Sequence, residues 1–186
     1  MGAKIVFVGS HGVGKTSIIT RYQDRLFNDN VKATVGVGWT RVSVDYEGQD
    51  VSLDCWDTAG QEQYNSLMPM YFRDADAVVI VADLSLYDSL SHIDDYYLMA
   101  RGVVPDDCYY IVVGNKTDAP RDERIDERTI PAYGDKIDAL FSIETSAVEG
   151  NGIDELFYNI ARAISGKQMR EKPVLDVLRS NNKGCC

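Results

Sequence analysis

The sequence predicts an α/β fold with a mostly parallel sheet, and two kinds of segment lead to this expectation. Short continuous apolar runs at 77–82 (AVVIVA) and 109–113 (YYIVV) are typical of central strands buried on both faces. Segments with helical periodicity alternate with the strands along the chain, which indicates a parallel sheet with crossover helices. With 186 residues, of which 45% are hydrophobic, the chain is long enough for one domain with a substantial core.

The expected elements follow one another in a regular order. The first strand is apolar except for Lys4 and leads directly into a glycine-rich loop and a helix. A turn at Glu47-Gly48-Gln49 separates two strand-like segments and predicts a hairpin. Strands are expected at 3–8, 38–46, 51–56, 77–82, 109–113 and 141–144, and helices at 16–26, 63–73, 85–102, 129–140 and 152–164. The periodicity weakens after about residue 166, so we expect a domain at 1–166 and a flexible tail at 167–186.

The composition argues against several classes of protein. The formal net charge of −10 disfavours a general nucleic-acid binder, which would need clustered lysine and arginine. No apolar run approaches the ~20 residues that span a bilayer, and the N-terminus lacks the pattern of a signal peptide. Cys55 and Cys108 lie in strand-like runs and are expected to be small buried hydrophobic residues, which fits a reducing cytosolic compartment.

A phosphate-binding loop is expected between the first strand and the first helix. Gly9, Gly14, Lys15 and Thr16 match the pattern G-x-x-x-x-G-K-[ST]. Glycines let the backbone wrap so that successive N–H groups point at an anion, and the following helix directs its positive end there. Lys15 adds a cation for the β- and γ-phosphates, and the Thr16 hydroxyl can bind Mg²⁺. The alternative, a glycine-rich turn that binds nothing, is disfavoured by the preceding strand, the spacing and the Lys-Thr pair. Nucleotide contacts are expected at Gly12, Val13, Gly14, Lys15, Thr16 and Ser17.

A second loop, after the strand at 109–113, is expected to bind the base. Asn115, Lys116 and Asp118 form an N-K-x-D set well downstream of the phosphate loop. The Asp118 carboxylate can accept hydrogen bonds from guanine N1–H and its 2-amino group, donors that adenine lacks there. The apolar stem of Lys116 can lie over the purine ring, and Asn115 can tie neighbouring loops together. Alone, the set would also fit a polar turn that caps a strand.

With these two loops identified, the chain resembles the small GTPases of the Ras superfamily and, among them, the Rab branch, over roughly residues 3–166 and the last two. Five motifs occur in the order of that family: GSHGVGKT, Thr34 in KATVGVGW, WDTAGQE, NKTD and ETSA. The resemblance implies a P-loop NTPase fold, the G domain, with a six-stranded, mostly parallel sheet flanked by helices on both faces. It also implies a GTP/GDP-dependent switch that hydrolyses GTP slowly, with Mg²⁺ as cofactor.

The resemblance gives each motif a role. Thr34 is similar to the first-switch threonine, which binds Mg²⁺ and contacts the γ-phosphate, and Asp57 is similar to the residue that holds Mg²⁺ through water. Gly60 resembles the second-switch glycine, whose N–H contacts the γ-phosphate, and Gln61 the catalytic glutamine that orients the attacking water. The remaining implied nucleotide contacts are the backbone N–H groups of Ser146 and Ala147 at the guanine oxygen and the Phe27 ring beside the base. For Phe27, a hydrophobic staple at the helix end is the alternative.

The resemblance to the Rab branch depends on three aromatics and the C-terminus. Trp39, Trp56 and Tyr71 have the spacing of the aromatics on which Rab proteins present their effector surface, although composition alone would make them a strand-and-helix cluster. Cys185 and Cys186 resemble a doubly geranylgeranylated terminus and do not fit the C-a-a-X form. Two lipid chains suit stable anchoring, since one chain holds a protein only marginally. A metal site is the alternative for this pair, but further ligands are lacking nearby in the sequence.

The family pattern and the tail together define the expected partners. Residues 167–186 contain five basic and two acidic residues, a net charge of +3. We expect a monomer that cycles between the cytosol and the cytosolic face of intracellular membranes. Its expected partners in vesicle traffic are effector proteins, an exchange factor and a GTPase-activating protein, and nucleic acid is not among them.

Two departures from the family pattern concern effector binding and hydrolysis. Gly36-Val37-Gly38-Trp39 replaces the family's GxDF, which removes an acidic side chain from the effector face. His11 stands in the phosphate loop where Ras proteins need glycine and Rab proteins often carry a small residue. Its imidazole is either a steric brake on hydrolysis or a solvated side chain without a role. A nucleotide-locked scaffold that only recruits partners is therefore the alternative to a hydrolase, although the intact Gln61 disfavours it, and Asp118 disfavours an ATPase or kinase.

Overall fold

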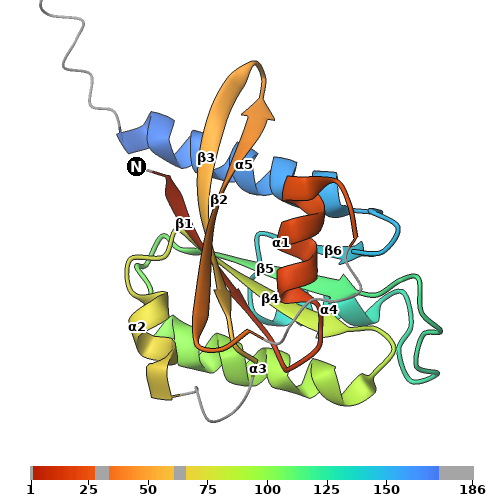
Figure 1. Ribbon diagram of the computed structural model, residues 1–186. Helices are drawn as coiled ribbons and strands as arrows, with labels where there is room; N and C mark the ends of the chain where they lie inside the picture. The colour runs from red at the N-terminus through yellow and green to blue at the C-terminus, as the bar shows by residue number, and fades with distance from the viewer. Residues whose placement is uncertain (1, 28–33, 61–65, 172–186) are drawn as a thin grey trace, which may run out of the picture.

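The computed structural model describes residues 2–27, 34–60 and 66–171, without the side chains of 168–171, and confirms the α/β fold (Figure 1). The elements in chain order are β1 (Ala3–Val8), α1 (Lys15–Asp24), β2 (Val37–Tyr46), β3 (Gln49–Thr58), α2 (Met68–Phe72), β4 (Ala77–Asp83), α3 (Tyr87–Arg101), β5 (Tyr109–Asn115), α4 (Thr129–Lys136), β6 (Phe141–Thr145) and α5 (Ile153–Glu171). The strands form one six-stranded sheet in the order β2-β3-β1-β4-β5-β6.

The sheet is mostly parallel, as expected. β1 pairs in parallel with β3 and β4, and β5 pairs in parallel with β4 and β6. Among the described strands, β2 and β3 form the antiparallel pair that the hairpin turn predicted. Because the parallel strands share a direction, their carboxyl ends meet at one edge of the sheet, and the loops that follow them gather there.

Each face of the sheet carries its own hydrophobic core. Ile5 and Phe7 of β1 belong to the core that α1 and α5 cover, while Val6 and Val8 belong to the core under α2, α3 and α4. All four side chains are fully buried. Burial on both faces removes the usual alternation of polar and apolar residues, which explains why such a strand is a continuous apolar run.

The strand predictions are correct to within two residues at either end, but several helices end elsewhere than expected. The helix expected at 16–26 stops at Asp24, because Arg25 adopts a left-handed φ of 59° and donates its N–H to the Arg21 carbonyl. The helix expected at 129–140 stops at Lys136, and the left-handed Asp138 (φ 54°) follows soon after. Of the helix expected at 63–73, the structure describes α2, while residues 61–65 lie outside the described part of the chain.

The last helix is longer than expected. α5 begins at Ile153, close to the expected start, but continues to Glu171 instead of ending at 164. Lys167 fastens it to the sheet through ion pairs with Asp76 (3.3 Å) and Asp107 (2.8 Å), which precede β4 and β5. The helix therefore passes residue 166 without a break, and the remainder of the expected tail, 172–186, lies outside the described residues.

Candidate functional site

Most described residues of the expected nucleotide site lie at or just after the carboxyl ends of the parallel strands. The loop with the glycine-lysine motif follows β1, Asp57 lies near the end of β3, and Asn115 is the last residue of β5. Ser146 and Ala147 come directly after β6. This edge is where open parallel sheets bind their ligands, because the loops there converge from separate strands.

The phosphate loop is closed around the Lys15 side chain. The ammonium group of Lys15 donates to the carbonyl oxygens of Gly9 (2.7 Å) and Ser10 (2.9 Å). Burial lowers the pKa of Lys15 to about 8, and the negative charge of Asp57 partly opposes this shift. At Gly14, φ is 101° and a Cβ atom would lie 2.3 Å from Nδ2 of Asn115, so a side chain does not fit there. The other expected contacts in this segment, Gly12, Val13 and Ser17, lie in the same loop and in the first turn of α1.

The three expected magnesium ligands meet in space. The hydroxyl groups of Thr16 and Thr34 both donate to Oδ2 of Asp57, at 2.6 Å and 2.9 Å, and lie 3.0 Å from one another. The second carboxylate oxygen, Oδ1 of Asp57, is buried and has no hydrogen-bond partner among the described residues. Oxygen ligands of this kind are those that Mg²⁺ prefers, and an unpaired buried carboxylate oxygen is costly without a cation. The donor set therefore fits a magnesium ion.

Gly60 brings the second expected switch against the phosphate loop. A Cβ atom on Gly60 would lie 2.5 Å from the Ser10 carbonyl and 2.6 Å from the His11 nitrogen, so the two backbones are in close contact. The side chain of His11 itself is exposed. Gln61, the expected catalytic residue, lies outside the described residues. Gly60 contacts the phosphate loop and directly precedes Gln61 in the chain. A conformational change in the phosphate loop can therefore displace Gly60, where the segment that carries Gln61 begins.

Asn115 ties three loops together, as expected from its place after the strand. Its side-chain amide donates to the Val13 carbonyl (2.9 Å) and its amide oxygen accepts from the Thr145 hydroxyl (3.0 Å). The residue is 1% exposed, so both bonds are shielded from water. The phosphate loop, the loop after β5 and the loop after β6 are thereby held in one arrangement.

The residues expected to contact guanine also lie together. The Asp118 carboxylate accepts a hydrogen bond from the Ser146 hydroxyl (2.6 Å), which joins the NKTD and ETSA motifs. Ala147, which follows Ser146 in the chain, is buried. Lys116 adopts a left-handed φ of 71°. Phe27 is half-buried against the core between the sheet and helices α1 and α5.

Two ion pairs beside these loops did not emerge from the sequence motifs. The Lys116 ammonium pairs with Asp83 at the end of β4 (2.6 Å), and Arg121 pairs with Glu144 through both of its terminal nitrogens. Asp83 carried one signal that could have revealed it, since it ends a wholly apolar strand at the edge where the site forms. Arg121 lies in a polar stretch of mixed charge and offered no comparable signal.

The three aromatics of the expected effector surface come from neighbouring elements. Trp39 and Trp56 are directly paired across β2 and β3, so their side chains share one face of the sheet. Trp39 is 54% exposed, whereas Trp56 and Tyr71 are partly buried against the core under α2 and α3. Exposure of so large an aromatic is typical of an interaction surface.

The cysteines fall into two groups. Cys55 and Cys108 are buried free thiols, as expected, and burial raises the pKa of both, that of Cys108 to about 12. Cys185 and Cys186 lie outside the described residues.

A separate observation bears on the membrane: within the described part of the chain, no helix combines the length and the apolar character needed to cross a bilayer.

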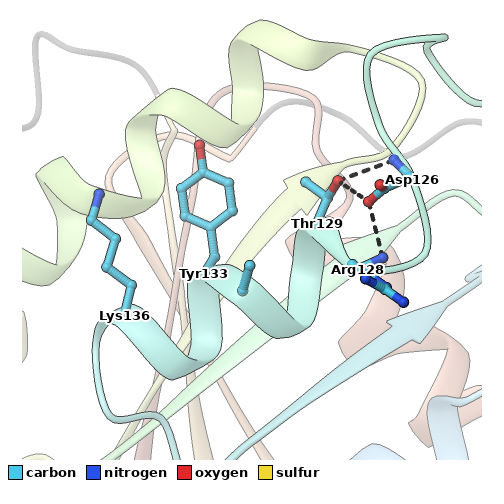
Figure 2. A pocket seen from close by; sticks show the side chains of 6 residues that line it. Asp126, Arg128, Thr129, Tyr133 and Lys136 are labelled. Atoms are coloured by element: carbon cyan, nitrogen blue, oxygen red, sulfur yellow. Dashed lines mark hydrogen bonds between the residues drawn. The ribbon is translucent and has the colours of Figure 1, made fainter.

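A further pocket lies beside α4 and contains none of the expected site residues (Figure 2). Its volume is about 380 Å³, and its lining consists of Asp126, Arg128, Thr129, Ala132, Tyr133 and Lys136. Asp126 accepts hydrogen bonds from the Thr129 hydroxyl (2.8 Å) and the Arg128 backbone N–H (3.0 Å). These hydrogen bonds therefore stabilise the N-terminal end of α4.

Comparison with known proteins gives one consistent result. The model of the Ras family matches residues 4–166. The Ras-related protein Rab-12 of Rattus norvegicus is 32% identical over 177 residues, which are 95% of this chain and 71% of the relative. Rab-22A of Homo sapiens is 35% identical over 161 residues, 87% of this chain and 82% of the relative. Rab-21 of Geodia cydonium is 33% identical over 162 residues, 87% of this chain and 70% of the relative.

Proposed function

The chain belongs to the Ras family, in its Rab branch, and from this premise we propose which of its residues carry out each step of its function. The protein is a small GTPase that binds guanine nucleotide, hydrolyses GTP and acts as a switch in vesicle traffic together with regulators and effectors. The proposal assigns this activity to a domain at 1–166. Its main support is that Thr16 and Thr34 meet at the Asp57 carboxylate, whose other oxygen has no hydrogen-bond partner within the described part of the chain.

In the proposed site, Gly12 to Ser17 surround the phosphates with backbone N–H groups, and Lys15 supplies a positive charge to the β- and γ-phosphates. Thr16, Thr34 and Asp57 would hold Mg²⁺, which supplies positive charge to neutralise the phosphate oxygens during transfer. Thr34 lies in the segment before β2, and Gly60 lies in the segment after β3. Contacts of both residues with the γ-phosphate would order these segments in the GTP state and release them in the GDP state.

The base is held by the second set of loops. Asp118 accepts hydrogen bonds from guanine N1–H and the 2-amino group, and the Ser146 hydroxyl bond keeps the carboxylate in place. The stem of Lys116 covers one face of the purine, the backbone N–H groups of Ser146 and Ala147 contact the guanine oxygen, and Phe27 lies beside the base. Adenine would leave Asp118 without donors, which gives the site its selectivity.

Hydrolysis requires that Gln61 orient a water molecule for attack on the γ-phosphorus. The phosphate charge that develops is met by Lys15 and by the N–H groups of the phosphate loop. His11 is exposed, and we propose that its imidazole lies on the side from which a GTPase-activating protein would supply an arginine. The protein therefore hydrolyses GTP slowly by itself and faster with its activating partner.

Membrane attachment and effector binding use other parts of the chain. We place the effector surface at Trp39, Trp56 and Tyr71, of which Trp39 is the most exposed. Geranylgeranyl groups on Cys185 and Cys186 anchor the monomeric protein to the cytosolic face of intracellular membranes, since two lipid chains hold stably. Exchange with the cytosol follows the nucleotide cycle.

One pair of variants tests the magnesium assignment. Thr16→Val removes the hydroxyl that bonds to Asp57, whereas Thr20→Val removes a hydroxyl that bonds to backbone carbonyls of the same helix. Both proteins are loaded with fluorescent GDP, and release is followed at millimolar Mg²⁺. We expect Thr16→Val to release GDP about tenfold faster or more and Thr20→Val to behave like the wild type. Equal release from both variants would contradict the assignment.

A further inference from the structure

Asp83 and Lys116 form a charged contact behind the proposed guanine loop. The Lys116 ammonium lies 2.6 Å from Oδ2 of Asp83, and the two side chains are 35% and 8% exposed. Asp83 is the last residue of β4 and is paired in register with Asn115, the last residue of β5. The contact therefore joins the last residue of β4, Asp83, to the residue that follows β5, Lys116.

The Asp83 carboxylate is also held in place by hydrogen bonds that do not involve Lys116. Its other oxygen, Oδ1, accepts hydrogen bonds from the backbone N–H (2.8 Å) and the hydroxyl (2.6 Å) of Ser85. Its backbone N–H donates to the Ser89 hydroxyl (2.8 Å). With one oxygen held by Ser85, Oδ2 remains for Lys116, and its position is set by the end of β4 and the turn after it.

The backbone of Lys116 is also held in one conformation. Its φ of 71° lies in the left-handed region, which residues other than glycine rarely adopt and which persists only when the surroundings hold it. Its carbonyl accepts from the Ala119 N–H (3.0 Å), and the following N–H, of Thr117, donates to the Thr145 carbonyl (3.1 Å). The backbone is thus fixed at both ends of the N-K-x-D turn, and the ion pair with Asp83 fixes the side chain.

We propose that Asp83 is a positioning residue that slows the release of guanine nucleotide by holding Lys116 in place. This inference rests on the proposed guanine site. A lysine tethered at its ammonium group keeps its apolar stem at one location, so less conformational freedom is lost when a purine packs against it. Because the contact acts on the base side, it should affect GDP and GTP alike, unlike a change among the magnesium ligands.

The test is a double-mutant cycle on nucleotide release. Fluorescent GDP and GTP are displaced by excess unlabelled nucleotide from the wild type, Asp83→Asn, Lys116→Met and the double variant. We expect Asp83→Asn to release both nucleotides about tenfold faster, the effect of losing one charge-assisted hydrogen bond. In the Lys116→Met background the same change should alter release less than about twofold, because the group it acts through is gone. Asp76→Asn, which removes a carboxylate paired with Lys167 at the other end of β4, should leave release unchanged.

Several results would overturn the proposal. Unchanged release from Asp83→Asn would do so, and so would an equal acceleration in the Lys116→Met background, which would indicate a general loss of structure. If Asp83→Asn does not fold, Ser85→Ala provides a milder test, since it removes one of the bonds that fix the carboxylate, and it should speed release of both nucleotides two- to threefold. Ser85→Ala that releases like the wild type would then count against the proposal. Failure of the wild type to bind guanine nucleotide would instead overturn the proposed site itself.

Discussion

Thr16 and Asp57 are joined by a hydrogen bond of 2.6 Å although 41 positions separate them in the chain. The bond connects the first turn of α1 with the end of β3, and Thr34 donates to the same carboxylate oxygen. Three segments that are far apart in the sequence are therefore held at one point, where oxygen ligands for a cation gather.

Asp57→Asn tests the charge of the magnesium site. An amide keeps the size of the side chain but loses the negative charge that attracts a divalent cation, so the Mg²⁺ concentration needed to retain nucleotide should rise about 10- to 100-fold. The measurement is retention of fluorescent GDP during an Mg²⁺ titration. Asp50→Asn, an exposed position on the same strand, is the control and should leave the titration unchanged. Identical titrations of Asp57→Asn and the wild type would show that Asp57 does not hold the cation.

Asp118→Asn tests the base. The amide can donate where the carboxylate accepted, so preference should shift from guanine towards xanthine, which carries a 2-oxo group in place of the 2-amino group. Competition of GTP and xanthosine triphosphate for the loaded protein measures the shift. Asp122→Asn, four positions along the same loop, serves as the control and should keep the guanine preference. Unaltered GTP affinity of Asp118→Asn would place the guanine site elsewhere.

Gln61→Leu tests the chemistry. Leucine cannot orient the attacking water, but it leaves the phosphate and guanine contacts intact, so hydrolysis should fall about tenfold or more while binding stays the same. Single-turnover hydrolysis of preloaded GTP separates these two effects, and Gln49→Leu at the hairpin is the matched control. Equal hydrolysis rates for Gln61→Leu and the wild type would mean that Gln61 has no part in the reaction.

His11→Gly tests the steric brake. An arginine supplied by an activating partner contributes about 10³–10⁵ in rate, and the imidazole competes for the volume that this arginine would enter. Glycine should therefore speed hydrolysis, chiefly in the presence of the partner. The rates are measured with and without a GTPase-activating protein. If both rates match those of the wild type, His11 is a solvated side chain without influence on hydrolysis.

Deletion of Cys185 and Cys186 tests the anchor. The truncated protein should still bind GTP, but it should no longer partition with membranes in cells, because the net charge of +3 in 167–186 gives at best about 1 kcal/mol per basic residue near anionic lipid. Cell fractionation with an antibody to the chain measures this. Cys108→Ser, at a buried thiol, is the control that changes cysteine content without touching the terminus. Truncated protein that still sediments with membranes would indicate another anchor.

The central strands of the sheet could be predicted well from the sequence because they are buried on both faces. β1, for example, is apolar except for Lys4, and its ends coincide with the predicted ones. Helix ends were less predictable because they depend on single backbone conformations. Arg25, at the end of α1, and Asp138, shortly after α4, both have positive φ. Neither is a glycine, the residue that usually marks such a position in a sequence.

The site could be predicted where a motif fixes both the residue and its spacing. The Lys15-Thr16 pair and the N-K-x-D set belong to this class, and the structure places them at one edge of the sheet. The pairing of Asp83 with Lys116 could not be predicted in this way, because it depends on the register of β4 against β5. Contacts of this kind are decided by tertiary structure and leave no local pattern.

The nucleotide bound to the purified full chain tests the central claim most directly. Released by heat and identified by ion-exchange chromatography, it should be GDP, with GTP in addition if hydrolysis is slow. Loading with GTP and Mg²⁺ should then give stoichiometric GTP that is converted to GDP over time. Adenine nucleotide on the purified protein, or no guanine nucleotide after loading, would contradict the assignment of this chain as a guanine-nucleotide switch.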